Sequence, residues 1–237
     1  MPVSRRRFLG VAAAIPWAVR DGFARGPLTD RLAGLTAPRA DSGAPRCVLA
    51  DLGADCALPE SLAGFERGLR AASVGFERVA AGEISPARLI LVPGAVLRSA
   101  GTAEALASLA AGGSTVVYES GAAYADSEGL ASEQRLLARY FGVRVDAALD
   151  LWSLHEGLAF APYVHYAWPS KAMVRDFSRA RPVRSAAAIA YCAGLPVACR
   201  GSAGRGTFVY LGSALGPHLS VGDPEALALL KGLVAGA

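Results

Sequence analysis

The sequence predicts an α/β fold: a mainly parallel sheet covered by helices on both faces, with antiparallel strands added toward the C-terminus. Three observations support this three-layer sandwich. Short apolar runs alternate with helical patterns up to residue 142, extended runs follow one another from residue 143 onward, and 53% of the 237 residues are hydrophobic. That share of apolar residues is ample for a buried core.

The first half of the predicted domain alternates strands with helices. Apolar runs typical of buried strands cover 47–52, 76–80, 87–92 and 114–119, with 76–80 at an edge. Helical patterns cover 59–72, 103–111 and 133–141. We expect Pro93 and Gly94 to stop the strand before them, Thr102 to cap the second helix and Gly142 to end the third. Such alternation favours right-handed crossovers and therefore a parallel sheet.

The second half of the chain changes character after Val143. Extended segments follow one another without helices between them, at 143–149, 163–168, 172–177, 186–192, 197–200 and 207–211. A last helix is predicted at 224–234, with Asp223 as its N-cap. The sheet should therefore gain an antiparallel portion.

A targeting motif opens the chain. It reads Ser4-Arg5-Arg6-Arg7-Phe8-Leu9-Gly10 and precedes a mildly apolar run at 11–19, which is too short to span a bilayer as a helix. It resembles the twin-arginine signal family, whose pattern is Ser/Thr-Arg-Arg-x-Phe-Leu-Lys. Arg5, Arg6, Phe8 and Leu9 match that pattern, and Gly10 stands where Lys is usual. The alternative is an amphipathic first helix with a basic end.

This resemblance implies an order along the chain and a destination. We expect a signal peptide at 1–25, a Pro- and Gly-rich linker at 26–45 and one α/β domain at 46–237. The implied partner during export is the twin-arginine translocase. The implied location is periplasmic or secreted, with a membrane anchor if the signal is not cleaved.

The charge of the chain argues against a nucleic-acid partner. The sequence has 24 Lys and Arg against 20 Asp and Glu, but five of the Arg and only one Asp lie within 1–25. The remainder is therefore neutral, whereas nucleic-acid binding needs a standing cationic footprint.

The four cysteines allow two interpretations. Cys192 and Cys199 flank a turn in a predicted hairpin, and their odd separation would place both side chains on one face. A disulfide between them is one expectation, and two buried thiols are the other. No Cys-x-x-Cys or His-x-x-x-His spacing occurs, so we expect no metal site and no cofactor, although a cofactor-bearing redox protein is a further reading of a twin-arginine signal.

Three segments resemble the class I glutamine amidotransferase-like superfamily. They are Leu89-Ile90-Leu91-Val92-Pro93-Gly94-Ala95, the stretch 106–117 with its Gly112-Gly113 turn, and Gly204 to Ser213. The branch that contains the trimerisation domain of bacterial β-galactosidases is the most similar. The resemblance covers roughly residues 46–234. It implies a flavodoxin-like, amidotransferase-like sandwich.

Both halves of the amidotransferase dyad are missing. Catalytic members place a cysteine on the turn after the strand that here is 114–119, where this chain has Glu119-Ser120-Gly121. Their histidine follows the strand at 208–211, where this chain continues with Gly212-Ser213. The resemblance therefore implies the fold without the activity. The alternative is a serine hydrolase that uses Ser120 and His218, with Glu119 or Asp126 as the orienting carboxylate.

Two sets of residues are candidates for binding a ligand. Open α/β sheets bind ligands at the carboxyl ends of their parallel strands, which points to Pro93, Gly94, Glu119 and Ser120. An aromatic run, Tyr163, His165, Tyr166 and Trp168, suits stacking on sugars, although a strand with aromatic residues on both faces explains it better. We expect an exported, non-catalytic domain that binds a ligand or protein partner in a carbohydrate-related system, with a homo-oligomer as one arrangement.

Overall fold

The three-layer α/β sandwich is confirmed. The computed structural model describes residues 47–150, 162–176, 179–185 and 187–237. A nine-stranded sheet has the order β2-β1-β3-β4-β11-β10-β9-β6-β7, and β5 and β8 form a separate pair. The strands are β1 Cys47–Asp51, β2 Glu77–Ala80, β3 Leu89–Ala95, β4 Thr115–Ser120, β5 Arg144–Val145, β6 Tyr163–Tyr166, β7 Ala172–Arg175, β8 Val183–Arg184, β9 Ala188–Cys192, β10 Leu195–Ala203 and β11 Gly206–Leu211.

The pairing between neighbouring strands changes once across the sheet, from parallel to antiparallel. β2, β1, β3, β4 and β11 run parallel, whereas β11, β10, β9, β6 and β7 pair antiparallel. β11, from late in the chain, lies directly beside β4, so the two halves of the sequence share one continuous sheet. The predicted antiparallel C-terminal portion is therefore confirmed.

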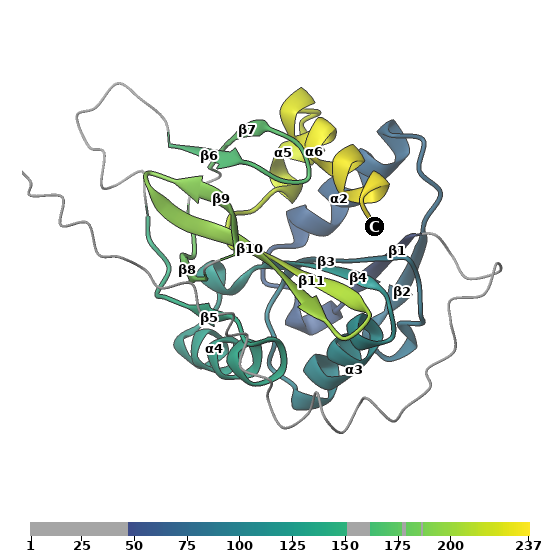
Figure 1. Cartoon of the computed structure of the whole chain (residues 1–237), viewed down its shortest axis with the longest axis vertical. Coiled ribbons are helices and arrows are strands. Elements are labelled where there is room, and N and C mark those ends of the chain that lie inside the picture. Colours follow the sequence, from purple (N-terminus) through teal and green to yellow (C-terminus); the bar gives the residue numbers. More distant parts are fainter. Residues whose placement is uncertain (1–46, 151–161, 177–178, 186) are drawn as a thin grey trace, which may run out of the picture.

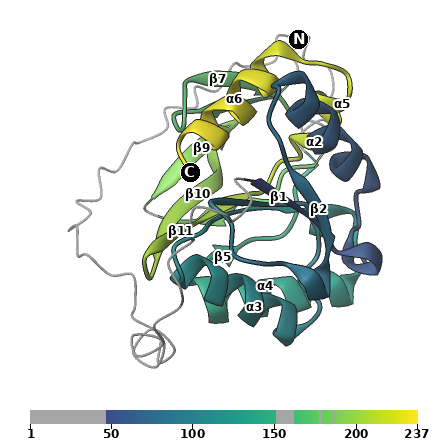
Figure 2. The same ribbon diagram turned by 90° about the vertical axis from the view of Figure 1, so that its right-hand side faces the viewer.

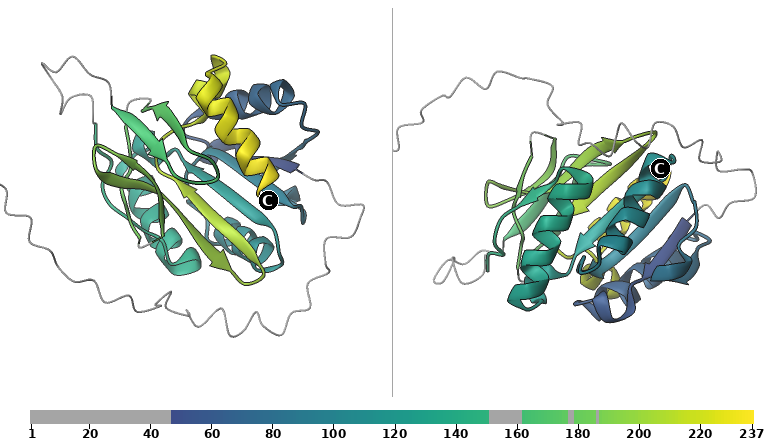
Figure 3. Two further views of the ribbon diagram at one scale, coloured as in Figure 1. Left: turned by 45° about the horizontal axis from the view of Figure 1, so that its top comes forward. Right: turned by 90° about the horizontal axis from the view of Figure 1, so that it is seen from below.

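Helices cover both faces of the sheet (Figure 1, Figure 2). The helices are α2 Pro59–Ala71, α3 Ala100–Ala111, α4 Ser127–Phe141, α5 Gly216–Ser220 and α6 Pro224–Ala235. α3 and α4 lie side by side over one face, and α2, α5 and α6 lie over the other (Figure 3). Each helical layer encloses its own apolar core against the sheet. Leu69 and Leu229 belong to the α2, α5 and α6 side, and Leu106 and Leu137 belong to the α3 and α4 side.

Several predicted boundaries were wrong for identifiable reasons. Ser99, not Thr102, caps α3, because its hydroxyl accepts the backbone N–H of Thr102 at 3.5 Å. α4 begins six residues before the predicted start, where Asp126 accepts the Gly129 N–H at 2.7 Å. β3 continues through Pro93 to Ala95, since Gly94 takes a φ of +55° and carries the strand through an irregular register.

Candidate functional site

The four residues predicted at the carboxyl ends of the strands do lie together. Pro93 and Gly94 are in the last three residues of β3, and Glu119 and Ser120 end the neighbouring strand β4. Ala95 stands opposite Ser120 in the ladder. The sequence therefore identified the carboxyl ends of two neighbouring strands. The contacts of each side chain there decide what chemistry this site can perform.

The Glu119 carboxylate is fully buried and binds backbone N–H groups from two other segments. It accepts the Gly94 N–H at 2.8 Å, the Gly216 N–H at 2.9 Å and the Leu215 N–H in a short contact. Burial raises the pKa of Glu119, and the N–H donors oppose that rise because they favour the ionised form. Glu119 therefore joins the ends of β3 and β4 to the start of α5.

The Ser120 hydroxyl points to the opposite face, toward α4. It lies 3.0 Å from both carboxylate oxygens of Glu133 and is itself buried. Glu133 also contacts the Tyr118 hydroxyl and the Arg181 guanidinium, and burial raises its pKa while Arg181 opposes that rise. We call these four residues, Tyr118, Ser120, Glu133 and Arg181, the Glu133 network.

Ser120 and His218 are not brought together. Ser120 faces α4, whereas His218 belongs to α5, which packs on α2 across the sheet. Burial lowers the pKa of His218, and the neighbours that act on its charge are Asp223 and Arg175. The geometry therefore does not assemble a Ser120–His218 pair.

The two carboxylates proposed to orient His218 have other roles. Asp126 caps α4 and lies 3.3 Å from the Arg98 guanidinium, and Glu119 binds the backbone N–H groups described above. The groups that act on the charge of His218 are Asp223 and Arg175, and neither of the two proposed carboxylates is among them. The serine-hydrolase alternative therefore gains no geometric support at this edge.

The aromatic run divides between two faces. Tyr163 and His165 are exposed, whereas Tyr166 is buried in the core beneath α6. Trp168 packs against that core, and the Arg200 guanidinium stacks over its ring at 4.6 Å from the centroid. Trp168 is therefore held by protein contacts and lies apart from Glu119 and Ser120.

The predicted disulfide is wrong, because all four cysteines are free thiols. Cys199 pairs with Ala188 across the β9–β10 hairpin, and Ala188 lies four residues from Cys192, which is about 13 Å along a strand. Register shifts in β10 also turn Cys199 toward the α3 and α4 core, while Cys192 faces the other core. Neither distance nor direction allows a bridge.

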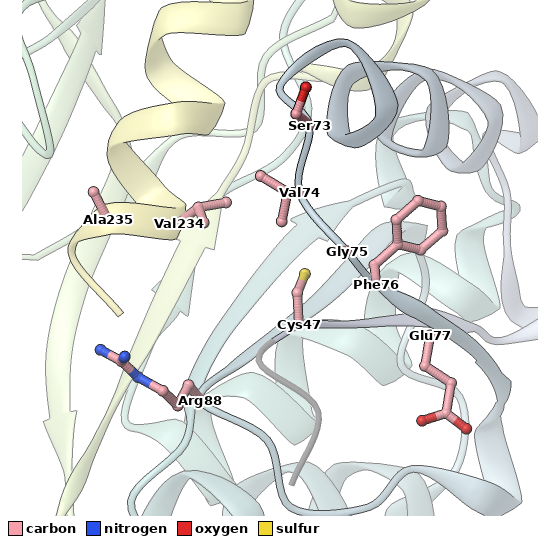
Figure 4. Close-up of a pocket in the computed structure, with 9 residues that line it drawn as sticks. All are labelled: Cys47, Ser73, Val74, Gly75, Phe76, Glu77, Arg88, Val234 and Ala235. Carbon is pink, nitrogen blue, oxygen red and sulfur yellow. The ribbon is translucent and has the colours of Figure 1, made fainter. Parts of the chain in front are cut away.

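A cavity of ≈ 700 Å³ lies at the opposite edge of the sheet (Figure 4). Its lining includes Cys47 at the start of β1, Phe76 before β2 and Arg88 before β3. Arg88 donates to the Ala237 carbonyl oxygen at 2.5 Å beside Val234. This cavity is separated from Glu119 by the length of the parallel strands.

The described ranges contain no group of three or more His, Cys, Asp or Glu side chains placed to hold a metal ion. No helix in them has the length and apolar character needed to cross a bilayer.

Comparisons with known proteins locate the fold. No protein-family model matches the chain, and no curated protein matches it. Among solved structures, the β-galactosidase of the Antarctic haloarchaeon Halorubrum lacusprofundi superposes with a TM-score of 0.60 at 18% identity, over 84% of this chain and 31% of that chain. The β-galactosidase of Bacillus circulans sp. alkalophilus gives 0.56 at 16% identity, over 81% of this chain and 30% of that one.

A cytoplasmic protein of Salmonella typhimurium LT2 has the same fold over nearly its whole length. It gives a TM-score of 0.56 at 12% identity, over 80% of this chain and 98% of the other. The chain thus covers about a third of the length of the β-galactosidases and nearly the whole length of the Salmonella protein. At these identities the likeness shows a shared fold, one that occurs both as part of a large glycosidase and alone.

Proposed function

We propose that residues 46–237 form a non-catalytic binding domain of a carbohydrate-related system and that residues 1–25 direct its export by the twin-arginine translocase. The observation that carries the first part is the bonding of Glu119. A carboxylate at the strand end where the resembling enzymes place their nucleophile turn is bonded to backbone N–H groups of Gly94, Leu215 and Gly216. Those bonds serve the fold.

The neighbouring hydroxyl supports the same proposal. Ser120 is 3% exposed and shares both oxygens of Glu133, which Arg181 neutralises. A nucleophile needs a base that can take its proton and an open approach for the substrate. A carboxylate that is ion-paired to a buried guanidinium is a poor base, and the described part of the chain buries Ser120.

The link to carbohydrate rests on the solved structures that share the fold. In the two β-galactosidases the matched region is 31% and 30% of the chain. We infer that the fold serves this protein as an accessory domain, either alone or within a homo-oligomer.

One experiment tests binding against catalysis. The full chain is run through native gels that contain neutral or acidic polysaccharides, and it is assayed in parallel with chromogenic esters and galactosides. We expect at least one polysaccharide class to retard the protein and no turnover above the buffer rate. Turnover that disappears in Ser120→Ala would overturn the proposal, and so would unretarded migration in every gel.

A further inference from the structure

One face of the antiparallel strands carries aromatic side chains that are exposed in the part of the chain that the structure describes. In the ladders, His165 of β6 stands opposite Met173 of β7 on one side and Tyr191 of β9 on the other. Tyr163 stands opposite Arg175. Residues directly opposite one another in antiparallel strands project to the same face. We call this surface the Tyr163–Tyr191 face; it consists of Tyr163, His165, Met173, Arg175 and Tyr191.

The alternation along the strands makes this surface distinct from the core. Val164, Tyr166, Val174 and Cys192, which alternate with the residues of the face, are buried beneath α6. On the face itself Tyr163 is 38% exposed, Tyr191 44% and Met173 49%. These are three of the five large hydrophobic side chains that are exposed within the described ranges. Such concentration on one flat surface marks an interaction site.

The geometry suits a flat ligand with both apolar and polar parts. Tyr163 and Tyr191 are diagonal neighbours on adjacent strands, so their positions lie about 7–8 Å apart, and His165 stands directly opposite Tyr191. A tyrosine ring offers an apolar body and a hydroxyl tip. Two such rings on one sheet face form a platform for the apolar faces of consecutive sugar rings, while the hydroxyl tips reach the polar rims.

The charged residues on and beside this face indicate which class of carbohydrate it would bind. Strands β6, β7 and β9 contain no Asp or Glu, whereas Arg175 lies on the face and the exposed Lys171 directly precedes β7. Asp176, the next residue after β7, is buried and accepts the Ser213 hydroxyl at 2.6 Å. The Glu225 carboxylate accepts the Met173 backbone N–H at 3.3 Å. Backbone N–H groups lie in the plane of the sheet, so Glu225 lies at the side of the sheet and not on this face. Lys171 and Arg175 therefore place positive charge on the described part of this surface.

We propose that the Tyr163–Tyr191 face binds an acidic polysaccharide built of uronic acid residues. Tyr163 and Tyr191 stack on the sugar rings, and Lys171 and Arg175 pair with the carboxylates. This inference rests on the proposed carbohydrate-binding function and names its surface and ligand class. The edge with Glu119 and Ser120 then serves the fold.

The test compares polygalacturonate with the same polymer after methyl esterification, which removes the charge and keeps the backbone. Titration calorimetry of the full chain should show at least about tenfold weaker binding of the ester, and salt should weaken binding of the acid. Tyr163→Ala and Tyr191→Ala should each weaken binding about tenfold. Tyr140→Ala, in α4 and away from the face, is the matched control and should leave affinity unchanged.

A second pair of variants separates charge recognition from folding. Lys171→Gln and Arg175→Gln should narrow the difference between the acid and the ester without weakening binding of the ester. Circular dichroism confirms that each variant is folded.

The outcomes distinguish the two proposals. If the chain binds polysaccharides and the two tyrosine variants bind as tightly as wild type, the inference about the Tyr163–Tyr191 face is overturned and the proposed function stands. If the chain binds no polysaccharide, both fall. If sedimentation shows a dimer that Tyr191→Ala dissociates, the face is occupied by a second copy and the inference is overturned.

Discussion

Glu133 and Arg181 form an ion pair that is closed to solvent, with 0% and 2% of the two side chains exposed. Arg181 also donates to the carbonyl oxygens of Leu130 and Asp146 at 3.2 and 3.1 Å. The pair joins α4 to the segment before β8, 48 residues further along the chain. It therefore holds the helical layer against the antiparallel half of the domain.

Removing one partner of this pair should be costly. Arg181→Met leaves the Glu133 charge buried without compensation, so the free energy of unfolding should fall by about 3–5 kcal/mol in urea denaturation. Arg184→Met is the matched control, because its pair with Asp146 is 75% and 39% exposed. That variant should lose less than about 1 kcal/mol.

The double variant Arg181→Met with Glu133→Gln tests the cause. The amide keeps hydrogen bonds to Tyr118 and Ser120 and removes the uncompensated charge, so part of the lost stability should return. A double variant no more stable than Arg181→Met alone would contradict a role for charge burial.

The contact between α2 and α5 should not tolerate a methyl group. A Cβ on Gly64 would lie 1.8 Å from the Gly216 carbonyl oxygen, so Gly64→Ala must push α5 away. We expect a loss of about 1–3 kcal/mol, the range for overpacked cores, measured by thermal or urea unfolding. Gly101→Ala in α3 is the control, because its Cβ meets nothing closer than 3.5 Å. That variant should gain up to about 1 kcal/mol from helix propensity; equal losses in both variants would refute the close approach.

The sequence predicted the layers and the change from parallel to antiparallel strands because apolar periodicity is a local property. Strands and helices alternate up to residue 142, and this alternation implies crossover connections. Crossover connections in turn place neighbouring strands parallel. α5 was missed because five residues beginning with Gly216-Pro217 are too few to show a helical period. β8, with two residues, was missed for the same reason.

The sequence predicted where the candidate site lies, but it did not predict the contacts that its side chains make. Glu119 and Ser120 were identified from their position after a strand, but local pattern cannot show that the first binds backbone N–H groups and the second a carboxylate. The ion pair of Glu133 and Arg181 could not be predicted, because local sequence patterns do not show contacts between residues 48 positions apart. The disulfide prediction assumed a regular hairpin, and the register shifts in β10 broke that assumption.

The cysteines should react unequally. Burial raises the pKa of Cys47 and Cys192 to about 12 and that of Cys199 to about 11, so their thiolates are scarce at pH 8. Cys56 is less buried. Ellman's reagent should therefore modify one thiol quickly in the folded chain and four after unfolding. Cys56→Ser should abolish the fast reaction, and a total of two thiols in the unfolded wild type would reveal a disulfide.

The stability of the fold should depend on His218 at mildly acidic pH. Burial lowers the pKa of His218 below its usual 6.5, and Asp223 opposes the change. The unfolded state then binds the proton more tightly, so the stabilisation is full above about pH 6.5 and is lost as the pH falls. Between pH 7.5 and 5.5, wild type should lose more free energy of unfolding than His218→Gln does. Parallel curves would show that His218 is protonated equally in both states.

Export should depend on two of three consecutive arginines. In the motif beginning at Ser4, Arg5 and Arg6 occupy the paired positions and Arg7 the variable one. A guanidinium is a planar fork with five donors, which a lysine ammonium cannot reproduce. Arg5→Lys with Arg6→Lys should therefore leave the full chain in the bacterial cytoplasm on fractionation and immunoblotting, whereas Arg7→Lys, with the same chemical change one residue later, should be exported like wild type. The twin-arginine pattern distinguishes Arg7 from Arg5 and Arg6, so equal export of both variants would overturn the assignment of residues 1–25 as a twin-arginine signal.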